Sequence, residues 1–248
     1  MKLRLVGLAY GLVCHGLFAV AIAAMVGNLY CGMQLGLGPS GTAGLVWNLL
    51  LVLQFPILHS ALLTPSGRTK LRFFAPSSVG STLDTTLFAT VSSLQTLALF
   101  ALWSPLPGPT GSAGGPAAVG LTAAYALGWL ALLKAMAEAG LGIQTGSTGW
   151  TALWRGDRPR YPKTFATTGL HGIVRHPIYA AFAVVLWTGP HWSIDRLVLG
   201  IPLTLYCIFG PRFKEARNRA RYGKAYDAHL DRTSPRFVPS NVRPRRTP

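Results

Sequence analysis

The stretch from Gly169 to Tyr179, Gly-Leu-His-Gly-Ile-Val-Arg-His-Pro-Ile-Tyr, places a guanidinium and an imidazole directly before an apolar run. Charged groups at the end of a membrane-embedded helix are tolerated where they face water or a ligand. Pro177 suits the first turn of a helix, because its missing N–H removes no hydrogen bond there. The free N–H groups of that turn, with Arg175 and His176, predict a positive concavity suited to a carboxylate. A basic loop flanking a membrane is the alternative interpretation.

Glu215 is the only acid in the stretch 211–226, where it stands among several Lys and Arg residues. Arg217 and Arg221 lie four residues apart, which predicts one face of an amphipathic cytoplasmic helix. An ion pair on such an exposed helix is worth only about 0.3–0.5 kcal/mol. The alternative is that Glu215 binds a cationic or hydroxylated group of a ligand. Residue chemistry alone leaves both interpretations open.

His59 and Ser60 end an apolar segment just before a basic loop, so they are candidates for the same pocket as Arg175 and His176. A polar cap on the helix end explains them equally well. Three other polar side chains stand alone inside apolar runs: His15, Gln54 and Gln95. We expect neighbouring helices to satisfy their hydrogen bonds.

The composition places the chain in a membrane. Hydrophobic residues make up 50% of it and charged residues 12%, whereas soluble domains carry roughly 25% charged residues. No charged residue occurs within 5–67 or within 85–133, and each run is far longer than the roughly 20 residues that cross a bilayer once. The sequence therefore predicts an all-α integral membrane protein.

About six apolar segments should position the polar residues, at about 5–26, 45–63, 83–103, 119–139, 179–187 and 196–209. The last two form a short helical hairpin, about 177–209. We expect a four-helix transmembrane region over residues 1–140. Residues 141–248 should form a second region that contains the hairpin, the polar residues and a basic cytoplasmic tail.

The charges of the loops predict the orientation in the membrane. The loops after the second and fourth segments and the tail are basic, while the loops 27–44 and 104–118 carry no charge. Every second loop is basic, so both termini should be cytoplasmic. The formal net charge of +16 then reflects attraction to anionic lipids of the cytoplasmic leaflet and predicts no nucleic-acid partner. The loop Ser104–Ala118, rich in Pro, Gly and Ser, should be flexible. Cys14, Cys31 and Cys207 have no spacing typical of a disulfide framework or a metal site.

The motif around Arg175-His176-Pro177-Ile-Tyr179, followed by Glu215, Gly223 and Tyr226, resembles the C-terminal signature of the isoprenylcysteine carboxyl methyltransferase superfamily. That signature reads Arg-His-Pro-x-Tyr, then Glu-Glu, then Gly-x-x-Tyr-x-x-Tyr. In the N-terminal half, Leu58-His59-Ser60 and Ser92-Ser93-Leu94 are similar to the methanethiol S-methyltransferase and NnrU-like branch. The chain departs from the family at three positions, which hold Lys214 for the first Glu, His229 for the second Tyr and Leu58 for a Gln.

The resemblance implies that S-adenosylmethionine binds in a cytoplasm-facing pocket capped by a C-terminal helix. The residues that it implies for cofactor binding are Gly169, Leu170, His176, Pro177, Tyr179, Glu215 and Tyr226. A thiol acceptor reacts as its thiolate. Arg175 is therefore a candidate to hold that anion, and His176 or His59 to accept the proton.

A small thiol such as methanethiol is the acceptor that this branch favours. Carboxyl methylation of an isoprenylcysteine or a related lipid-like acceptor is the alternative. From other classes, a membrane reductase that binds a nicotinamide and a non-enzymatic transporter or assembly factor also remain open. Asp84 and Glu138 are the only acids of the first four segments and stand at their ends, which disfavours a proton-coupled carrier.

Overall fold

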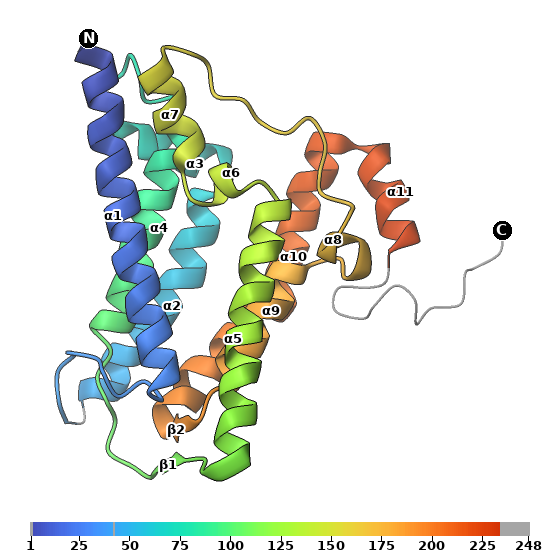
Figure 1. Ribbon diagram of the computed structural model, residues 1–248. Helices are drawn as coiled ribbons and strands as arrows, with labels where there is room; N and C mark the ends of the chain where they lie inside the picture. Colours follow the sequence, from blue (N-terminus) through green and yellow to red (C-terminus); the bar gives the residue numbers. More distant parts are fainter. Residues whose placement is uncertain (1, 42, 234–248) are drawn as a thin grey trace.

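The protein is an almost entirely helical bundle in a computed structural model that describes residues 2–41 and 43–233 (Figure 1). The long helices are α1 (Lys2–Tyr30), α2 (Ala43–Leu62), α4 (Asp84–Ala101), α5 (Gly115–Glu138) and α10 (Ile194–Tyr222). The shorter ones are α3 (Pro65–Leu71), the 3-10 turn η1 (Arg72–Phe74), α6 (Leu141–Gln144), α7 (Ser147–Arg155), α8 (Leu170–Ile173), α9 (Pro177–Trp187) and α11 (Lys224–Arg232). The strands β1 (Thr110–Ser112) and β2 (His191–Ser193) pair antiparallel.

The long helices fit a bilayer. Within the described ranges, α1, α2, α5 and α10 are each long and apolar enough to cross a membrane, and α9 is a shorter apolar helix. Their outward faces expose large apolar side chains, among them Leu12, Leu50 and Leu127. Soluble proteins rarely expose apolar surface over so wide an area. The predicted all-α integral membrane protein is confirmed. The expectation of about six crossings stays a prediction.

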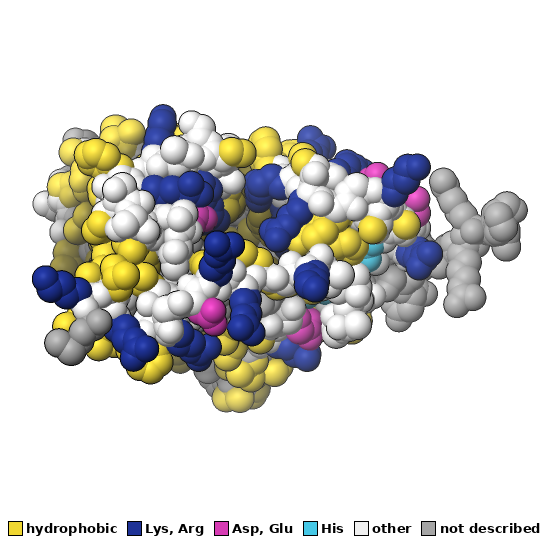
Figure 2. All heavy atoms as spheres, turned by 90° about the horizontal axis from the view of Figure 1, so that it is seen from above, with side chains coloured by type: hydrophobic (Ala, Val, Ile, Leu, Met, Phe, Trp, Pro, Cys, Tyr) yellow, Lys and Arg dark blue, Asp and Glu magenta, His cyan; other side chains and the backbone are white. Residues whose placement is uncertain are grey.

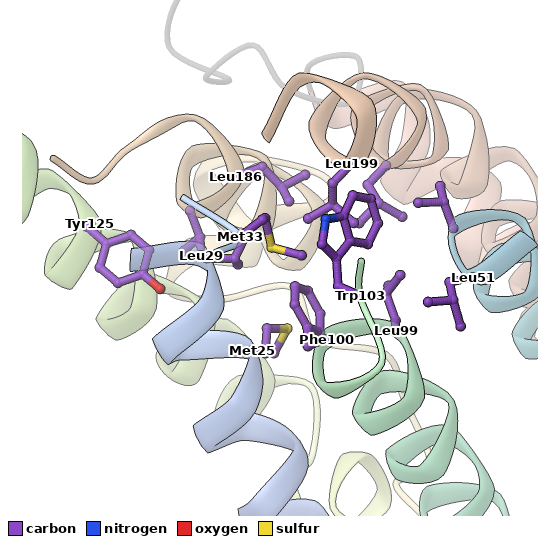
Figure 3. Packing of buried hydrophobic residues seen from close by; sticks show 13 residues of the cluster. Met25, Leu29, Met33, Leu51, Leu99, Phe100, Trp103, Tyr125, Leu186 and Leu199 are labelled. Carbon is purple, nitrogen blue, oxygen red and sulfur yellow. The ribbon is translucent and has the colours of Figure 1, made fainter. Parts of the chain in front are cut away.

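Two groups of helices meet along α2 and α10. Helix α1 packs against α4 and α7, whereas α5 packs against α9, and α9 against α10. Helix α2 contacts both α4 and α10 and so joins the groups. A buried cluster fills the space between them, with Trp103, Phe100, Leu29, Leu186 and Leu199 at its centre (Figure 3). This packing fixes how α9 and α10 present their polar ends.

A buried carboxylate fastens the end of the bundle that carries β1 and β2. Asp195 is 0% exposed and accepts hydrogen bonds from Gln34 Nε2 at 2.8 Å, Trp103 Nε1 at 2.8 Å and the Leu106 N–H at 3.0 Å. Its neighbour Arg196, also buried, donates to backbone carbonyls of the α9–β2 turn. The loop 104–118, expected to be flexible, is therefore tied down by Asp195 and by the strand pairing.

The C-terminal helices differ from the expected pattern. A separate helix was predicted to begin at Pro211, but α10 continues through Pro202 and Pro211 as far as Tyr222. The chain then turns at Gly223, whose φ of 53° lies in the left-handed region that glycine adopts readily. The stretch 211–226 is thus divided between α10 and α11. Pro177 lies in the first turn of α9, as predicted. Residues 234–248, the rest of the predicted tail, lie outside the described residues.

Lone polar groups inside the helices do find partners on neighbouring helices, as expected. Gln54 and Gln95 bond each other, with 3.2 Å between Gln95 Nε2 and Gln54 Oε1. His15 Nε2 accepts from Trp150 Nε1 at 3.0 Å. These contacts join neighbouring helices, and Gln95 Oε1 is left without a hydrogen-bond partner among the described residues.

The distribution of charge predicts the topology. Lys and Arg side chains gather at the end of the bundle where α3, α7 and α11 lie (Figure 2), and β1 lies at the opposite end (Figure 1). In a cysteine-free background, a cysteine at Ser112 should react with an impermeant maleimide on intact cells. A cysteine at Arg158 should react only after permeabilisation. Equal labelling of both in intact cells would contradict cytoplasmic termini.

The Asp195 cluster predicts a loss of stability when its carboxylate is removed. Asp195→Ala leaves Trp103 Nε1, which is buried, and the donors of Gln34 and Leu106 without this acceptor, so we expect a loss of about 3 kcal/mol. The melting temperature of the purified protein in detergent measures it. Asp157→Ala, which removes an exposed carboxylate paired with Arg160, is the control and should melt close to wild type. Equal melting of both variants would refute the structural role of Asp195.

Candidate functional site

The charged end of the bundle contains a buried histidine–glutamate pair. His176 directly precedes α9 and is 1% exposed, and Glu215 on α10 is 8% exposed. The distance from His176 Nε2 to Glu215 Oε1 is 2.9 Å. The packing of α9 against α10 brings these residues together, so the structure joins two predicted site residues that are far apart in the sequence.

The pair has a defined protonation pattern. An ionised carboxylate only accepts, so His176 Nε2 carries the hydrogen and Nδ1 is the free acceptor. Burial, opposed by Glu215 and reinforced by the charge of Lys214, lowers the pKa of His176 to about 4. The imidazole is therefore neutral near pH 7. Within the described chain, its buried Nδ1 has no hydrogen-bond partner, which is the state of a nitrogen that awaits a ligand group.

Arg175 is held by protein groups. Its guanidinium donates to the carbonyl oxygens of Leu230 at 2.7 Å and Thr233 at 2.8 Å, and reaches Glu215 Oε1 at 3.4 Å. Nε also approaches Thr233 Oγ1 at 3.3 Å. The guanidinium thus ties the end of α11 to Glu215. Few of its donors remain to hold an anionic acceptor, the role expected for it from the sequence.

One face of helix α11 packs against aromatic rings. Phe165, in the loop before α8, packs against Tyr222, Tyr226 and His229, with ring centroids 5.2, 4.9 and 5.0 Å away. Tyr226 is buried among them, at the position where the family motif places a tyrosine. Together with Arg175, this cluster positions α11 beside the His176–Glu215 pair.

The predicted residues Gly169 and Leu170 lie against a carboxylate that sequence reasoning had not assigned to the site. Glu138, the last residue of α5, accepts from the Leu170 N–H at 2.9 Å and pairs with Lys134 at 2.9 Å. Gly169 has a φ of 61°, and a Cβ there would collide with the Glu138 carboxylate. The i,i+4 pair of Lys134 and Glu138 at a helix end was the available signal.

His171 is a second residue that the sequence-based site omitted. Its Nδ1 lies 3.3 Å from Glu138 Oε2, and its side chain is buried. Burial lowers its pKa more than Glu138 raises it. Its Nε2 is buried and lacks a hydrogen-bond partner among the described residues. Two histidines that precede α9, His171 and His176, therefore each have one ring nitrogen without a hydrogen-bond partner among the described residues.

Aromatic and hydroxyl groups lead from this pair towards α2. Tyr179 on α9 lies edge-on to His176, with centroids 6.1 Å apart, and 6.2 Å from the ring of Tyr206 on α10. The Tyr206 hydroxyl lies 3.4 Å from Ser60 Oγ. Ser60 is therefore linked through Tyr206 and Tyr179 to His176, with which it was predicted to share a pocket.

His59 is oriented by its neighbours on α2 and α4. Its ring stacks on Phe55 at 5.1 Å and tilts against Phe88 at 5.0 Å. Its Nδ1 lies 3.2 Å from Ser92 Oγ. His59 makes no direct contact with His176 in the described chain. It forms part of the wall that α2 contributes, opposite α10.

The surface at this end is hollowed between the two groups of helices. Figure 2 shows hydrophobic side chains inside the hollow and Lys and Arg side chains around it. An apolar interior with a cationic rim can admit an uncharged or anionic small molecule and exclude cations.

Comparison with known proteins gives a consistent picture. The chain is 28% identical over 252 residues to methanethiol S-methyltransferase 2 of Bradyrhizobium diazoefficiens, which covers 100% of this chain and 95% of the relative. It is 26% identical over 233 residues to methanethiol S-methyltransferase of Pseudomonas sp. (strain GM41(2012)), covering 91% and 87% of the two chains. The enzyme of that name from Pseudomonas deceptionensis is 26% identical over 209 residues, covering 81% and 76%.

No family model and no solved structure matches the chain. The match to the Bradyrhizobium enzyme nevertheless covers 100% of this chain, and so includes both groups of helices and the candidate site. The resemblance predicted from the motifs is confirmed: along most of its length, this chain is similar to the methanethiol S-methyltransferases.

Proposed function

We propose that this protein is an integral membrane methyltransferase that transfers a methyl group from S-adenosylmethionine to a small thiol such as methanethiol. The observation that carries the proposal is the similarity to methanethiol S-methyltransferases along most of the chain. The buried His176–Glu215 pair at the charged end of the bundle supports it, because it supplies a carboxylate and an unpartnered nitrogen that a polar ligand could contact.

The residues at this end fit the chemical groups of S-adenosylmethionine. The Glu215 carboxylate suits an ammonium or a ribose hydroxyl, and the unpartnered His176 Nδ1 and His171 Nε2 suit hydroxyl or amino donors. The aromatic cluster around Phe165 offers rings for an adenine to stack on. We assign cofactor binding to the residues that the family motif marks, which are Gly169, Leu170, His176, Pro177, Tyr179, Glu215 and Tyr226.

The reaction asks the protein mainly for alignment. When bound, the sulfonium supplies a methyl group that a thiolate attacks in line. Glu215 and His176 hold the donor side, while Tyr179 and Tyr206 separate that side from α2. Closely packed aromatic rings exclude water. The exclusion of water and the fixed orientation of the two reactants both accelerate such a transfer.

We infer that the site lies at the cytoplasmic surface and that both termini share that side. The cationic rim would then also meet the anionic lipids of that leaflet. The residues of the proposed cofactor site come from the region 141–248, and the region 1–140 adds α2 and Glu138. A thiol that partitions into lipid could reach the hollow from the bilayer.

Binding of S-adenosylhomocysteine tests the cofactor site. Glu215→Gln and His176→Ala should each weaken its affinity at least about tenfold, since hydrogen bonds to charged groups are worth about 1.5–3 kcal/mol. Isothermal calorimetry on monodisperse protein measures it. The control is Asp227→Asn, which removes an exposed carboxylate that pairs with Arg219 on the same side of the bundle. Wild-type affinity in both site variants would contradict the assignment.

A panel of acceptors tests the reaction. Labelled S-adenosylmethionine should give a volatile methylated product with methanethiol, detected by mass spectrometry. Prenylated cysteine should give none. Product from prenylcysteine alone would establish carboxyl methylation as the activity. Binding of NADPH without binding of S-adenosylhomocysteine would point to a reductase, and binding of neither would favour a protein without this chemistry.

A further inference from the structure

Arg217 has a position on α10 that no sequence motif marks. It follows Tyr206 by about three helical turns, so the two side chains project from the same face of the helix. It is half-buried. In the described chain it makes no hydrogen bond or ion pair, whereas Arg175 and Arg68 are paired with Glu215 and Asp84.

Titratable groups of α2, α3, α9 and α10 lie within electrostatic range of Arg217. Those that interact with its charge are His59 of α2, Arg68 of α3, Tyr179 of α9, and Tyr206 and Lys214 of α10. None of these groups is a carboxylate. Asp84, the carboxylate nearest to Arg68, is engaged by Arg68 and Arg72. We call the part of the hollow between α2 and α10 the crevice. The crevice is therefore positive and, among the described residues, lacks a negative charge to balance Arg217.

The crevice opens onto the proposed donor site. Tyr179 touches both, because its ring lies edge-on to His176 and packs on Tyr206. The backbone of Gly210 leaves room for the Tyr179 ring, since a Cβ at this glycine would lie 3.1 Å from Tyr179 Cε1. Tyr179 thus contacts His176 of the His176–Glu215 pair and lies within electrostatic range of Arg217.

A half-buried guanidinium without a counter-charge is costly unless an anion joins it. The crevice walls are aromatic and hydroxylic, with Phe55 and Phe88 around His59 and with Ser60 bonded to Tyr206. These walls suit a small, soft anion with an apolar body. A thiolate has that chemistry.

We propose that Arg217 holds the sulfur of the acceptor as a thiolate in the crevice between α2 and α10. This inference rests on the proposed thiol methylation and names the residue that selects the ionised acceptor. Arg175 is unsuited to the role because its guanidinium is bonded to Leu230, Thr233 and Glu215.

The step balances in charge. The thiol gives its S–H proton to water, and the thiolate forms a new S–C bond to the methyl group. The S–C bond of the sulfonium breaks, and its electron pair stays on the donor sulfur. An anion and a cation thereby become two neutral thioethers. Arg217 attracts the thiolate but not the neutral thioether that is formed from it. The same contact therefore favours binding of the substrate and release of the product.

The test is the pH dependence of kcat/KM for methanethiol, from about pH 6 to 9, which spans the ionisation of a thiol near a cation. In Arg217→Gln, the rise with pH should move at least about one unit to higher pH, and the rate near pH 7 should fall about tenfold or more. A selenol is already ionised near neutrality, so the variant should lose much less activity with it. Arg217→Lys keeps the charge and should keep most of the wild-type profile.

The matched control is Arg212→Gln, an exposed arginine on the same helix whose guanidinium lies over Phe209. It should retain the wild-type profile. Arg217→Gln should also bind S-adenosylhomocysteine with wild-type affinity, which shows that the fold and the donor site are intact.

An unchanged pH profile in Arg217→Gln would overturn the assignment while leaving thiol methylation standing. A large loss of S-adenosylhomocysteine affinity in this variant would also overturn it, because Arg217 would then belong to the cofactor. A wild-type protein that binds S-adenosylhomocysteine and methylates no thiol would refute the proposed function itself, and the role of Arg217 with it.

Discussion

A carboxylate buried away from water has to collect hydrogen-bond donors, and α10 carries two, Asp195 and Glu215. Asp195 draws in donors from the segments beside α1 and α4. Glu215 draws in His176 and Arg175 from the segment before α9. Because both acids lie on one continuous helix, the distance between the fastened end and the candidate site is set by α10 itself. The continuation of α10 through Pro211 is therefore essential to the site.

The cations at the charged end divide into two kinds. Arg175, Arg68 and Arg219 are paired with acids and join segments. Others, Arg217 and Lys214 among them, have no such partner among the described residues. An unpaired charge lowers stability, whereas paired charges join elements. Such an unpaired charge is the expected signature of a binding group, because sites for ligands are built at a cost to the folded protein.

The site is assembled from both groups of helices, so it depends on the cluster between them. The cluster around Trp103 and Phe100 contains side chains of both α4 and α10, and α2 packs against both helices. The distance between α2 and α10 sets the width of the crevice. A small acceptor needs a narrow crevice that excludes water, whereas a prenylated peptide would need helices that part or a groove open to lipid.

Much of the architecture follows from the sequence by itself. Long charge-free runs predict membrane helices because an isolated charge in lipid is costly, and α1, α2, α5 and α10 confirm this. The start of α9 at Pro177 follows from the restricted backbone of proline. The motif around Arg175-His176-Pro177 and Glu215 predicted the family resemblance. Local chemistry and hydropathy sufficed for these conclusions, since each depends on residues close in the chain.

Only the tertiary structure decided which polar groups meet. The sequence could not pair Glu138 with Leu170 and His171, direct the guanidinium of Arg175 to the end of α11, or show that Arg217 has no ion pair among the described residues. It also predicted a separate helix over 211–226 and a flexible loop at 104–118, whereas α10 continues through Pro211 and the loop pairs with β2. These features depend on how each helix is rotated about its axis against its neighbours. That rotation is set by the fit of many side chains at once, and no short stretch of sequence determines it.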